Sequence, residues 1–405
     1  MQEDGMILTM KDKQRANVIA AVMDNKLEVE AAGRILKRSV RQIFRMLRRM
    51  RKEGIEGLIH KNRGIKSPFK VKERVRRTII TLATGKYHDV NDTQMKELLL
   101  REEGIRIGRE TLRTLLRRAG IEAKRSRRKP KYRRRRERKD SLGVMLQIDA
   151  SAHDWLEGRG PWITLVGAKD DATGYTWCKF VQAETTWSYL ELMREVFVSH
   201  GLPMSLYSDR HSIFHPLRQP TIMEQLKGIQ PLTQFGRAMD ELGIGIIKAW
   251  SPQAKGRIER LWGVLQDRLV VELRLQKANN LQQANDVLER FLVTYNQRFT
   301  FPAIKQGSAF RKAPATDTLD RILCLKDTRV VSADHTISFE GLILQIPPST
   351  KFRSIVKQQV EVLQVRDGSI QILYKGQLVA RFSPDAVARL IKTTLTEHTH
   401  LRMAV

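Results

Sequence analysis

The sequence has little cysteine and no long apolar run. Its two cysteines, Cys178 and Cys324, lie far apart, so they support neither a disulfide framework nor a zinc site, and they fit a reducing compartment. No signal peptide is recognisable, and no apolar run approaches the roughly 18 residues that a membrane-spanning helix needs. We therefore expect a soluble intracellular protein without a membrane partner.

Acidic residues are also few relative to basic ones. The 73 Lys and Arg against 44 Asp and Glu give a net charge of +29 and a pI near 10.4, which favours a polyanionic partner. Residues 1–140 hold 41 Lys and Arg against 18 Asp and Glu, a net of +23, so +6 remains for the other 265 residues. A hydrophobic content of 41% with 6 Trp and 13 Phe indicates folded domains rather than a basic packaging tail. A length of 405 residues allows two to four domains.

The first part of the chain has helical periodicity. We predict helices over 13–24, 29–36 and 40–52, the last with Ser39 as its N-cap. In the third helix the apolar side chains share one face, and Arg41, Arg45 and Arg48 occupy the others. A short helix, a tight turn and a basic helix are typical of a helix-turn-helix, which we predict for residues 10–66 as a DNA-binding domain. A small helical bundle with a solvated basic face is the alternative.

The same plan recurs over residues 70–123. Helices are predicted over 71–82, 92–103 and 109–119, with Arg109 and Arg113 on the outward face of the last. We expect a second helix-turn-helix-like domain, since two tandem modules grip a long DNA site better than one through their effective concentration.

A strongly basic block follows. Twelve of the sixteen residues 124–139 are Lys or Arg, and such a block repels itself and cannot form a core. We interpret residues 124–141 as a basic linker that contacts phosphates and makes DNA binding salt-dependent. A solvated hinge and a nuclear localisation signal are the alternatives.

Three carboxylates stand out in the middle of the chain. Asp149 ends a predicted strand over 144–149, Asp209 follows a strand over 202–208, and Glu259 lies near the start of a long helix. Strands over 162–171 and 175–181 and a helix over 185–199 complete a ribonuclease-H-like α/β pattern, which we assign to residues 142–302. Two strand-end aspartates and a helical glutamate can converge on two divalent metal ions, which clamp the attacking and leaving oxygens of a phosphodiester.

Three segments around these acids carry a family resemblance. They are Gln147-Ile-Asp149-Ala-Ser-Ala-His-Asp-Trp155-Leu-Glu-Gly-Arg-Gly-Pro161, Tyr207-Ser-Asp209-Arg-His-Ser-Ile-Phe214 and Ser251-Pro-Gln-Ala-Lys-Gly-Arg-Ile-Glu259-Arg-Leu-Trp262. The chain resembles the DDE transposases of the retroviral-integrase superfamily, closest to the ISNCY-type insertion-sequence transposases, over about residues 10–310. It departs from the wider superfamily at Arg210-His211, where an Asn-Gly pair usually follows the second aspartate, and roughly 15 extra residues separate Asp209 from Glu259.

The resemblance implies a function and a site. Asp149, Asp209 and Glu259 would be the metal-binding catalytic triad, holding two Mg²⁺ or Mn²⁺ ions by hard oxygen ligands. The enzyme would bind the ends of an insertion sequence, cleave their 3′ ends and transfer them into a target DNA duplex. It would act as a homo-oligomer on DNA, at the nucleoid in a bacterial cytoplasm.

Several neighbours of the triad have two interpretations each. Lys255, Arg257 and Arg260 are candidates for holding the scissile strand, or they form a solvated helix start. His153 and His211 are candidates for a fourth ligand or a proton carrier, or they make structural hydrogen bonds.

The C-terminal part alternates in the manner of strands. Short strands over 329–332, 336–339, 342–346, 359–365, 369–374 and 377–382, with turn signals at Asp367-Gly and Lys375-Gly, predict a small SH3-like β-barrel over residues 328–385. Related transposases carry such a barrel. It would bind DNA or a neighbouring subunit, or only stabilise the chain.

Two other functional classes remain open at this point. A catalytically silent DNA-binding regulator derived from a transposase would keep the N-terminal modules and need no triad. A ribonuclease-H-type nuclease would share the core but would not need two DNA-binding modules.

Overall fold

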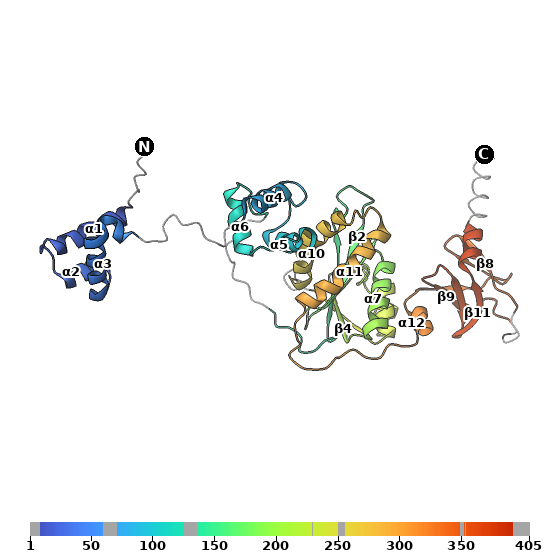
Figure 1. Cartoon of the computed structure of the whole chain (residues 1–405). Helices are drawn as coiled ribbons and strands as arrows, with labels where there is room; N and C mark the ends of the chain where they lie inside the picture. Colours follow the sequence, from blue (N-terminus) through green and yellow to red (C-terminus); the bar gives the residue numbers. More distant parts are fainter. Residues whose placement is uncertain are drawn as a thin grey trace. The chain divides into compact units, whose positions relative to one another are not determined.

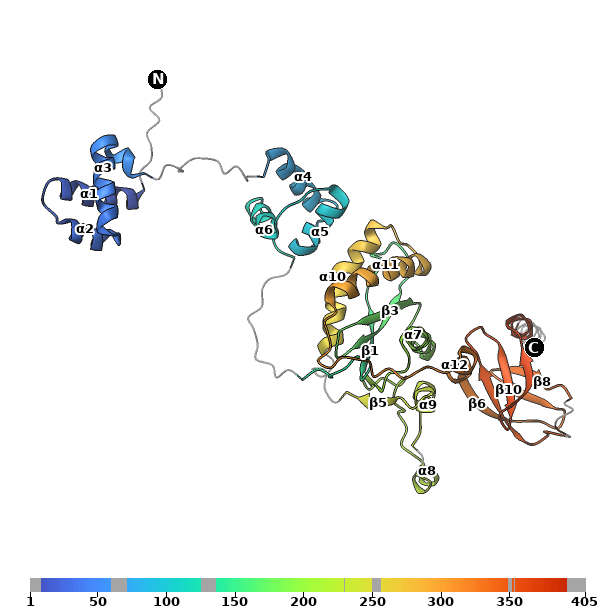
Figure 2. The same cartoon turned by 60° about the horizontal axis from the view of Figure 1, so that its bottom comes forward.

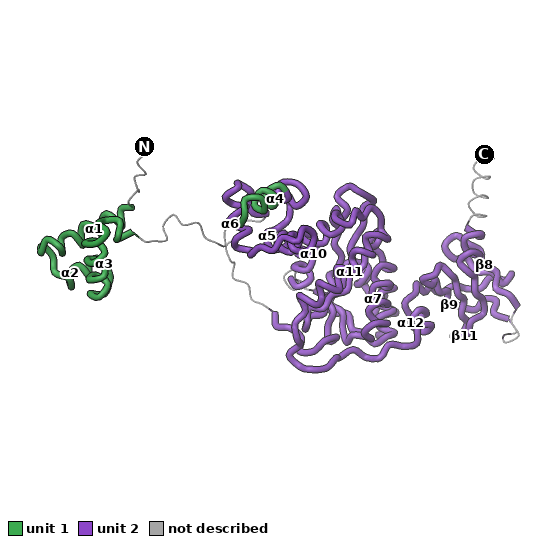
Figure 3. The backbone as a smooth tube through the Cα atoms, viewed as in Figure 1, with its two compact units in different colours: residues 1–81 green, residues 82–405 purple. Residues whose placement is uncertain are grey.

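A computed structural model describes residues 9–59, 71–124, 136–228, 230–249, 256–348, 352 and 354–391. The chain forms two compact units, Met1–Thr81 and Leu82–Val405, coloured separately in Figure 3. The boundary between them falls inside helix α4 (Glu73–Thr84). In the part of the chain that the structure describes, no helix is both long enough and apolar enough to cross a membrane.

The first unit is built around three helices and a short 3₁₀ turn. They are α1 (Met10–Met23), α2 (Val29–Leu36), α3 (Val40–Glu53) and η1 (Gly54–Leu58). The Ser39 hydroxyl accepts the Gln42 N–H, so the predicted cap of the third helix is confirmed. A buried core that includes Ile19, Ala32 and Ile43 joins the three helices, and leaves the basic face of α3 outside. The first helix begins three residues before its predicted start, because Thr9 and Asp12 form a capping box there.

Two further helices begin the second unit, α5 (Asp92–Glu103) and α6 (Arg109–Arg118). Asn91, rather than Asp92, is the N-cap of α5, because its side chain accepts the N–H groups of Thr93 and Gln94. The apolar face of α6 is buried as predicted, through Leu112, Leu115 and Leu116.

A five-stranded sheet forms the centre of the second unit (Figures 1 and 2). Its strands are β1 (Leu146–Ala152), β2 (Thr164–Asp170), β3 (Thr176–Val181), β4 (Ser205–Ser208) and β5 (Gly245–Lys248). The order is β3-β2-β1-β4-β5, with the first three strands antiparallel and β4 and β5 parallel to β1. An antiparallel meander followed by parallel strands is the predicted ribonuclease-H-like arrangement.

Helices cover both faces of this sheet. On one face lie α7 (Thr186–His200) and α9 (Gln234–Glu241), which pack against Leu146, Ile148 and their neighbours. On the other lie α10 (Gly256–Leu275) and α11 (Leu281–Phe299), which pack against Leu165 and Phe180. Because successive strand residues point to opposite faces, Gln147 and Asp149 are directed to the α10 side.

The sequence between β4 and β5 contains α9 and a shorter helix, α8 (Ile222–Leu226). Helix α8 has no buried residue, and Ile222, Met223 and Leu226 are exposed.

The segment after the core is more ordered than predicted. No helix or strand is predicted for residues 303–327, but α12 (Thr316–Ile322) forms there, and Leu319 and Leu323 enter the core on the α7 side of the sheet. These contacts are long-range, so local sequence does not reveal them.

Six strands follow, as predicted. A four-stranded antiparallel sheet has the order β11-β10-β9-β6 and comprises β6 (Leu325–Val330), β9 (Gln359–Gln364), β10 (Ile370–Tyr374) and β11 (Gln377–Phe382). The pair β7 (Thr336–Phe339) and β8 (Leu342–Gln345) forms a separate ribbon. One buried cluster joins the two sheets through residues such as Ile337, Val362 and Ile372. Among the described residues the hydrogen bonding leaves two sheets rather than a closed ring, so the SH3-like barrel stays a prediction.

Candidate active site

The strand that carries Asp149 continues beyond it. Strand β1 was expected to end at Asp149, but its antiparallel pairing with β2 places Asp149 opposite Gly167 and continues to Ala152 opposite Thr164. Asp149 therefore lies in the middle of a strand, where the sheet fixes the backbone on both sides of it.

The parallel pairing of β1 with β4 brings the second aspartate near the first. Leu146 is paired with Leu206 and Gln147 with Tyr207. Asp149 and Asp209 each lie two residues beyond the second of these pairs, Asp149 within β1 on its α10 side and Asp209 directly after the end of β4. The Asp209 carboxylate accepts the backbone N–H of His211 at 3.0 Å, which orders the turn after β4.

Helix α10 lies along β1 and is joined to it by three hydrogen bonds. The Ile258 N–H donates to the Gln147 side-chain oxygen at 3.3 Å, at the helix N-terminus. The Trp262 indole N–H donates to Asp149 Oδ2 at 2.9 Å. The Gln266 amide donates to the Ser151 hydroxyl at 3.1 Å. The helix therefore runs in the same direction as the strand and is held at three levels.

A glycine makes this close approach possible. A Cβ atom built on Gly167 would lie 2.6 Å from the Trp262 ring, so a larger residue on β2 would displace the indole. Trp262 is 7% exposed and also belongs to the buried cluster beneath α10. Packing and hydrogen bonding thus fix the indole that contacts Asp149.

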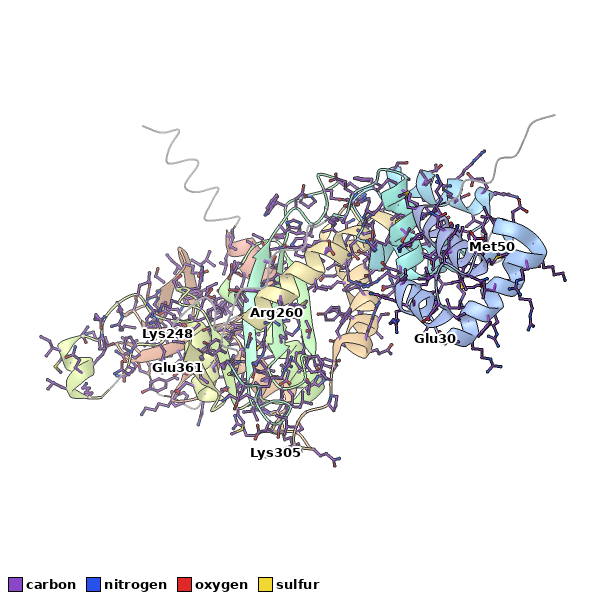
Figure 4. All side chains as sticks on the ribbon, turned by 90° about the vertical axis from the view of Figure 1, so that its left-hand side faces the viewer. Glu30, Met50, Lys248, Arg260, Lys305 and Glu361 are labelled. Atoms are coloured by element: carbon purple, nitrogen blue, oxygen red, sulfur yellow. The ribbon has the colours of Figure 1, made fainter. Side chains whose placement is uncertain are left out.

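Glu259 and Arg260 lie in the first turn of α10, and both are exposed (Figure 4 labels Arg260). Each residue turns an α-helix by about 100°, so Glu259 leaves the helix on the flank next to the face that Ile258 buries. In the described residues, no three His, Cys, Asp or Glu side chains are grouped closely enough to hold a metal ion. The donor chemistry of the three carboxylates nevertheless suits Mg²⁺ or Mn²⁺, which take oxygen ligands and retain water.

The electrostatics of the region connect the two aspartates to α7. The Tyr189 phenol donates to Glu184 at 2.7 Å. Burial raises the pKa of Tyr189 well above its ordinary value, and the negative charges of Glu184, Asp149 and Asp209 raise it further.

The two predicted auxiliary histidines make structural contacts. His153 packs edge-on against Trp155, with ring centroids 5.2 Å apart. His211 accepts the Ile213 N–H at its Nδ1 atom at 3.3 Å and lies in the turn after Asp209. A role of either as ligand or proton carrier stays a prediction.

The predicted DNA-contacting arginines differ in what surrounds them. Arg41, Arg45, Arg48, Arg109 and Arg260 are exposed. Arg113 is exposed too, but it pairs with Glu110 at 2.5 Å on the same helix. Arg257 pairs instead with the buried Asp171, and only 16% of its side chain is exposed, so its guanidinium is already committed inside the protein. Lys255 lies outside the described residues.

Sequence reasoning missed Gln147 and Trp262 as supports of the site. Both were part of the segments that carry the family resemblance, but they were not given a role. The signal that could have identified them is the strand alternation around Asp149, which places Gln147 and Ser151 on the same face as the acid. The partner on α10 follows only from the tertiary structure.

Comparison with known proteins gives matches over the N-terminal module and over the whole chain. A family model of a homeodomain-like domain matches residues 9–59. A protein of Sinorhizobium fredii (strain NBRC 101917 / NGR234) named "Putative transposase y4bF" is 33% identical over 396 residues, which cover 97% of this chain and 85% of that protein. The "Transposase for insertion sequence IS1202" of Streptococcus pneumoniae is 30% identical over 402 residues, covering 90% of this chain and 84% of that one. Among solved structures, the catalytic core domain of BIV integrase aligns with a TM-score of 0.28 and 17% identity, covering 42% of this chain and 90% of that chain.

Proposed function

This chain belongs to the transposases of insertion sequences, and on that premise we propose that it cleaves the 3′ ends of its element and transfers them into target DNA in a metal-dependent reaction. The observation that supports the proposal is the pairing of β1 with β4, which puts Asp149 and Asp209 two residues beyond the same pair, beside the helix whose first turn carries Glu259. We infer that these three carboxylates form the catalytic site.

The role of each residue follows from its surroundings. Asp149, Asp209 and Glu259 would hold two Mg²⁺ or Mn²⁺ ions through carboxylate oxygens. Such ions, when bound, activate the attacking oxygen and stabilise the leaving oxygen of an in-line displacement. The Trp262 N–H orients the Asp149 carboxylate, and the His211 N–H orients that of Asp209. Arg260, which is exposed and follows Glu259 in α10, would contact a DNA phosphate.

DNA binding would come mainly from the N-terminal modules. The homeodomain-like match covers α1, α2 and α3, and the exposed face of α3 carries Arg41, Arg45 and Arg48. We propose that these arginines contact the element ends, and that Arg109 and Arg113 of α6 add a second contact. Joining two ends in one reaction requires a homo-oligomer on DNA.

Asp209→Asn tests the catalytic assignment. The change keeps the shape of the side chain and removes its charge, so we expect it to fold and bind the element ends but to lose Mg²⁺-dependent nicking and joining. The matched control is Asp240→Asn, which changes an exposed aspartate of α9 and should cleave like the wild type. Retained cleavage in Asp209→Asn would refute the triad. End binding without any metal-dependent cleavage by the wild type would instead favour a silent DNA-binding regulator.

A further inference from the structure

A buried carboxylate outside the three acids joins three parts of the second unit. Asp171 follows β2 in the turn to β3 and is 1% exposed. It accepts hydrogen bonds from the Lys139 N–H at 2.9 Å and from the Gln147 amide at 2.8 Å. It also pairs with the guanidinium groups of Arg136 and Arg257. None of these four donor residues belongs to the β2–β3 turn that contains Asp171.

The donors belong to elements that matter for the proposed reaction. Arg136 and Lys139 lie at the end of the predicted basic linker, Gln147 lies two residues before Asp149, and Arg257 lies two residues before Glu259. The linker and α10 are also joined directly, because Arg257 donates to the Arg136 carbonyl at 2.6 Å. Asp171 therefore lies where the linker, β1 and α10 meet.

The end of the linker is bound to the protein although residues 136–138 are exposed. Arg138 donates to the carbonyl of Ala172 at 3.1 Å, and its guanidinium stacks over the Phe301 ring at 4.0 Å. Lys139 contributes its backbone N–H to Asp171. The predicted linker thus ends in an anchored segment at the turn between β2 and β3.

The surroundings keep Asp171 charged. Burial alone would raise the pKa of Asp171, but the Lys139 N–H and the charges of Arg257 and Arg136 lower it below its ordinary value. A neutral side chain at this position would leave the guanidinium of Arg257 buried without its counter-charge.

The ion pair with Asp171 holds the guanidinium of Arg257, which lies in the first turn of α10. Arg257 and Glu259 are two residues apart, so they leave the helix about 200° apart. Ile258, between them, is buried against the sheet. In the strand order β3-β2-β1-β4-β5, Asp171 follows β2 and Asp209 follows β4, on opposite sides of β1. With Arg257 held on the β2 side, Glu259 is directed to the β4 side, where Asp209 lies.

We propose that Asp171 is a positioning residue that sets the rotation of α10, and thereby the place of Glu259, while it anchors the end of the basic linker at the same point. The inference rests on the proposed function, because it assigns Glu259 to the metal site. It adds a residue that touches neither metal nor DNA but on which the geometry of the site depends.

Asp171→Asn tests this proposal in the full-length protein. The amide keeps the size of the side chain, but it replaces one acceptor oxygen with a donor that faces arginine N–H groups. Asp170→Asn is the matched control, since Asp170, the last residue of β2, is equally buried but accepts from Gly143 and Thr173 and not from Arg257. Arg257→Met removes the cationic partner of the same ion pair. Asp171 keeps its hydrogen bonds from Lys139 and Gln147 and its pair with Arg136.

Two measurements separate positioning from general loss of structure. The first is the binding of Mn²⁺ alone, followed by electron paramagnetic resonance of the DNA-free protein. The second is the Mg²⁺ concentration that gives half-maximal end nicking at saturating DNA. We expect both constants to rise at least about tenfold in Asp171→Asn and in Arg257→Met, the size of effect seen when an outer support of a metal ligand is lost. End affinity should not change, and Asp170→Asn should keep wild-type metal constants even if its melting temperature falls.

The outcomes are distinct. If Asp171→Asn and Arg257→Met show wild-type metal constants while Asp209→Asn abolishes Mn²⁺ binding and nicking, the proposed function stands and the positioning role is wrong. If Asp209→Asn also leaves both measurements unchanged, the triad is wrong and the positioning role falls with it. A variant that combines Asp171→Asn with Arg257→Met adds a third outcome. If its metal constants are no higher than those of either single variant, Asp171 and Arg257 act as one unit, which supports the proposal.

Discussion

The hydrogen bond from Trp262 to Asp149 gives the most direct test of how the fold supports the candidate site. Trp262→Phe keeps an aromatic ring beneath α10 and removes the indole N–H that donates to Asp149 Oδ2 at 2.9 Å. Gly167 packs against the six-membered part of the indole, so the smaller ring also leaves a small void there. The change therefore has one effect on the carboxylate and another on packing.

The size of the first effect follows from the burial of the bond. A hydrogen bond to a charged group contributes about 1.5–3 kcal/mol, and Trp262 is 7% exposed, so water does not easily replace the lost donor. A loss of about 2 kcal/mol corresponds to an approximately 30-fold higher metal concentration for half-maximal activity. The void should lower the free energy of unfolding by about 1–2 kcal/mol, because only part of a large side chain is removed.

The assay is end nicking as a function of Mg²⁺ concentration, at saturating DNA and at a temperature where both proteins are folded. Trp177→Phe is the control, because the buried Trp177 indole nitrogen has no hydrogen-bond partner among the described residues. It should lose some stability and keep the wild-type metal dependence. The reasoning would be refuted if Trp262→Phe had wild-type metal dependence while Asp209→Asn abolished cleavage.

Two further predictions concern stability. Burial lowers the pKa of Lys169 to about 8 from an ordinary 10.5. Below pH 8 the buried charge therefore lowers the free energy of unfolding by at most about 3 kcal/mol, and this destabilisation fades as the pH rises toward 10.5. Lys169→Met should therefore raise the melting temperature at pH 7 and gain less above pH 9; a gain independent of pH would contradict the assignment. Glu97 of α5 forms ion pairs with Arg268 and Arg298. Burial alone would raise the pKa of Glu97, but the two arginines lower it below its ordinary value, so the ion pairs persist until the pH falls below the ordinary carboxyl range. Glu97→Gln should weaken the contact of α5 with α10 and α11 by about 1 kcal/mol, seen as faster amide exchange in α5, and unchanged exchange would count against that contact.

Most helices and strands could be predicted from local signals. Hydrophobic periodicity and a capping residue locate α3 after Ser39, whose side chain accepts the Gln42 N–H. Alternation locates the three antiparallel strands of the core and the strands near the C-terminus. These patterns are local, so they need no knowledge of the neighbours in space.

The errors arise where tertiary contacts decide. The end of β1 was predicted at Asp149, yet pairing with β2 extends the strand to Ala152. Helix α12 was missed because it is short and its apolar residues pack against distant elements. Arg257 was expected to contact DNA because it is basic and next to Glu259, and the buried Asp171 that holds it is 86 residues away in sequence.

The candidate site shows the same division. The three acids could be identified from their sequence contexts and from a family resemblance, and their catalytic role stays a prediction. The residues that hold the acids, Gln147 and Trp262, could not be identified from the sequence, because their contacts depend on the placement of α10 along β1. A sequence identifies which residues carry the chemistry more readily than which residues hold them.

The contacts between α5 and α10 have a consequence for exchanging parts between related transposases. Asn91 caps α5 and also donates to Asp267 of α10 at 2.5 Å, while Arg101 pairs with Glu272 of the same helix. A chimaera that took residues 82–124 from a relative would lose these matched pairs unless α10 were changed with them. Because the first turn of α10 carries Glu259, a change of α10 that restores these pairs also alters the helix that holds a candidate catalytic acid.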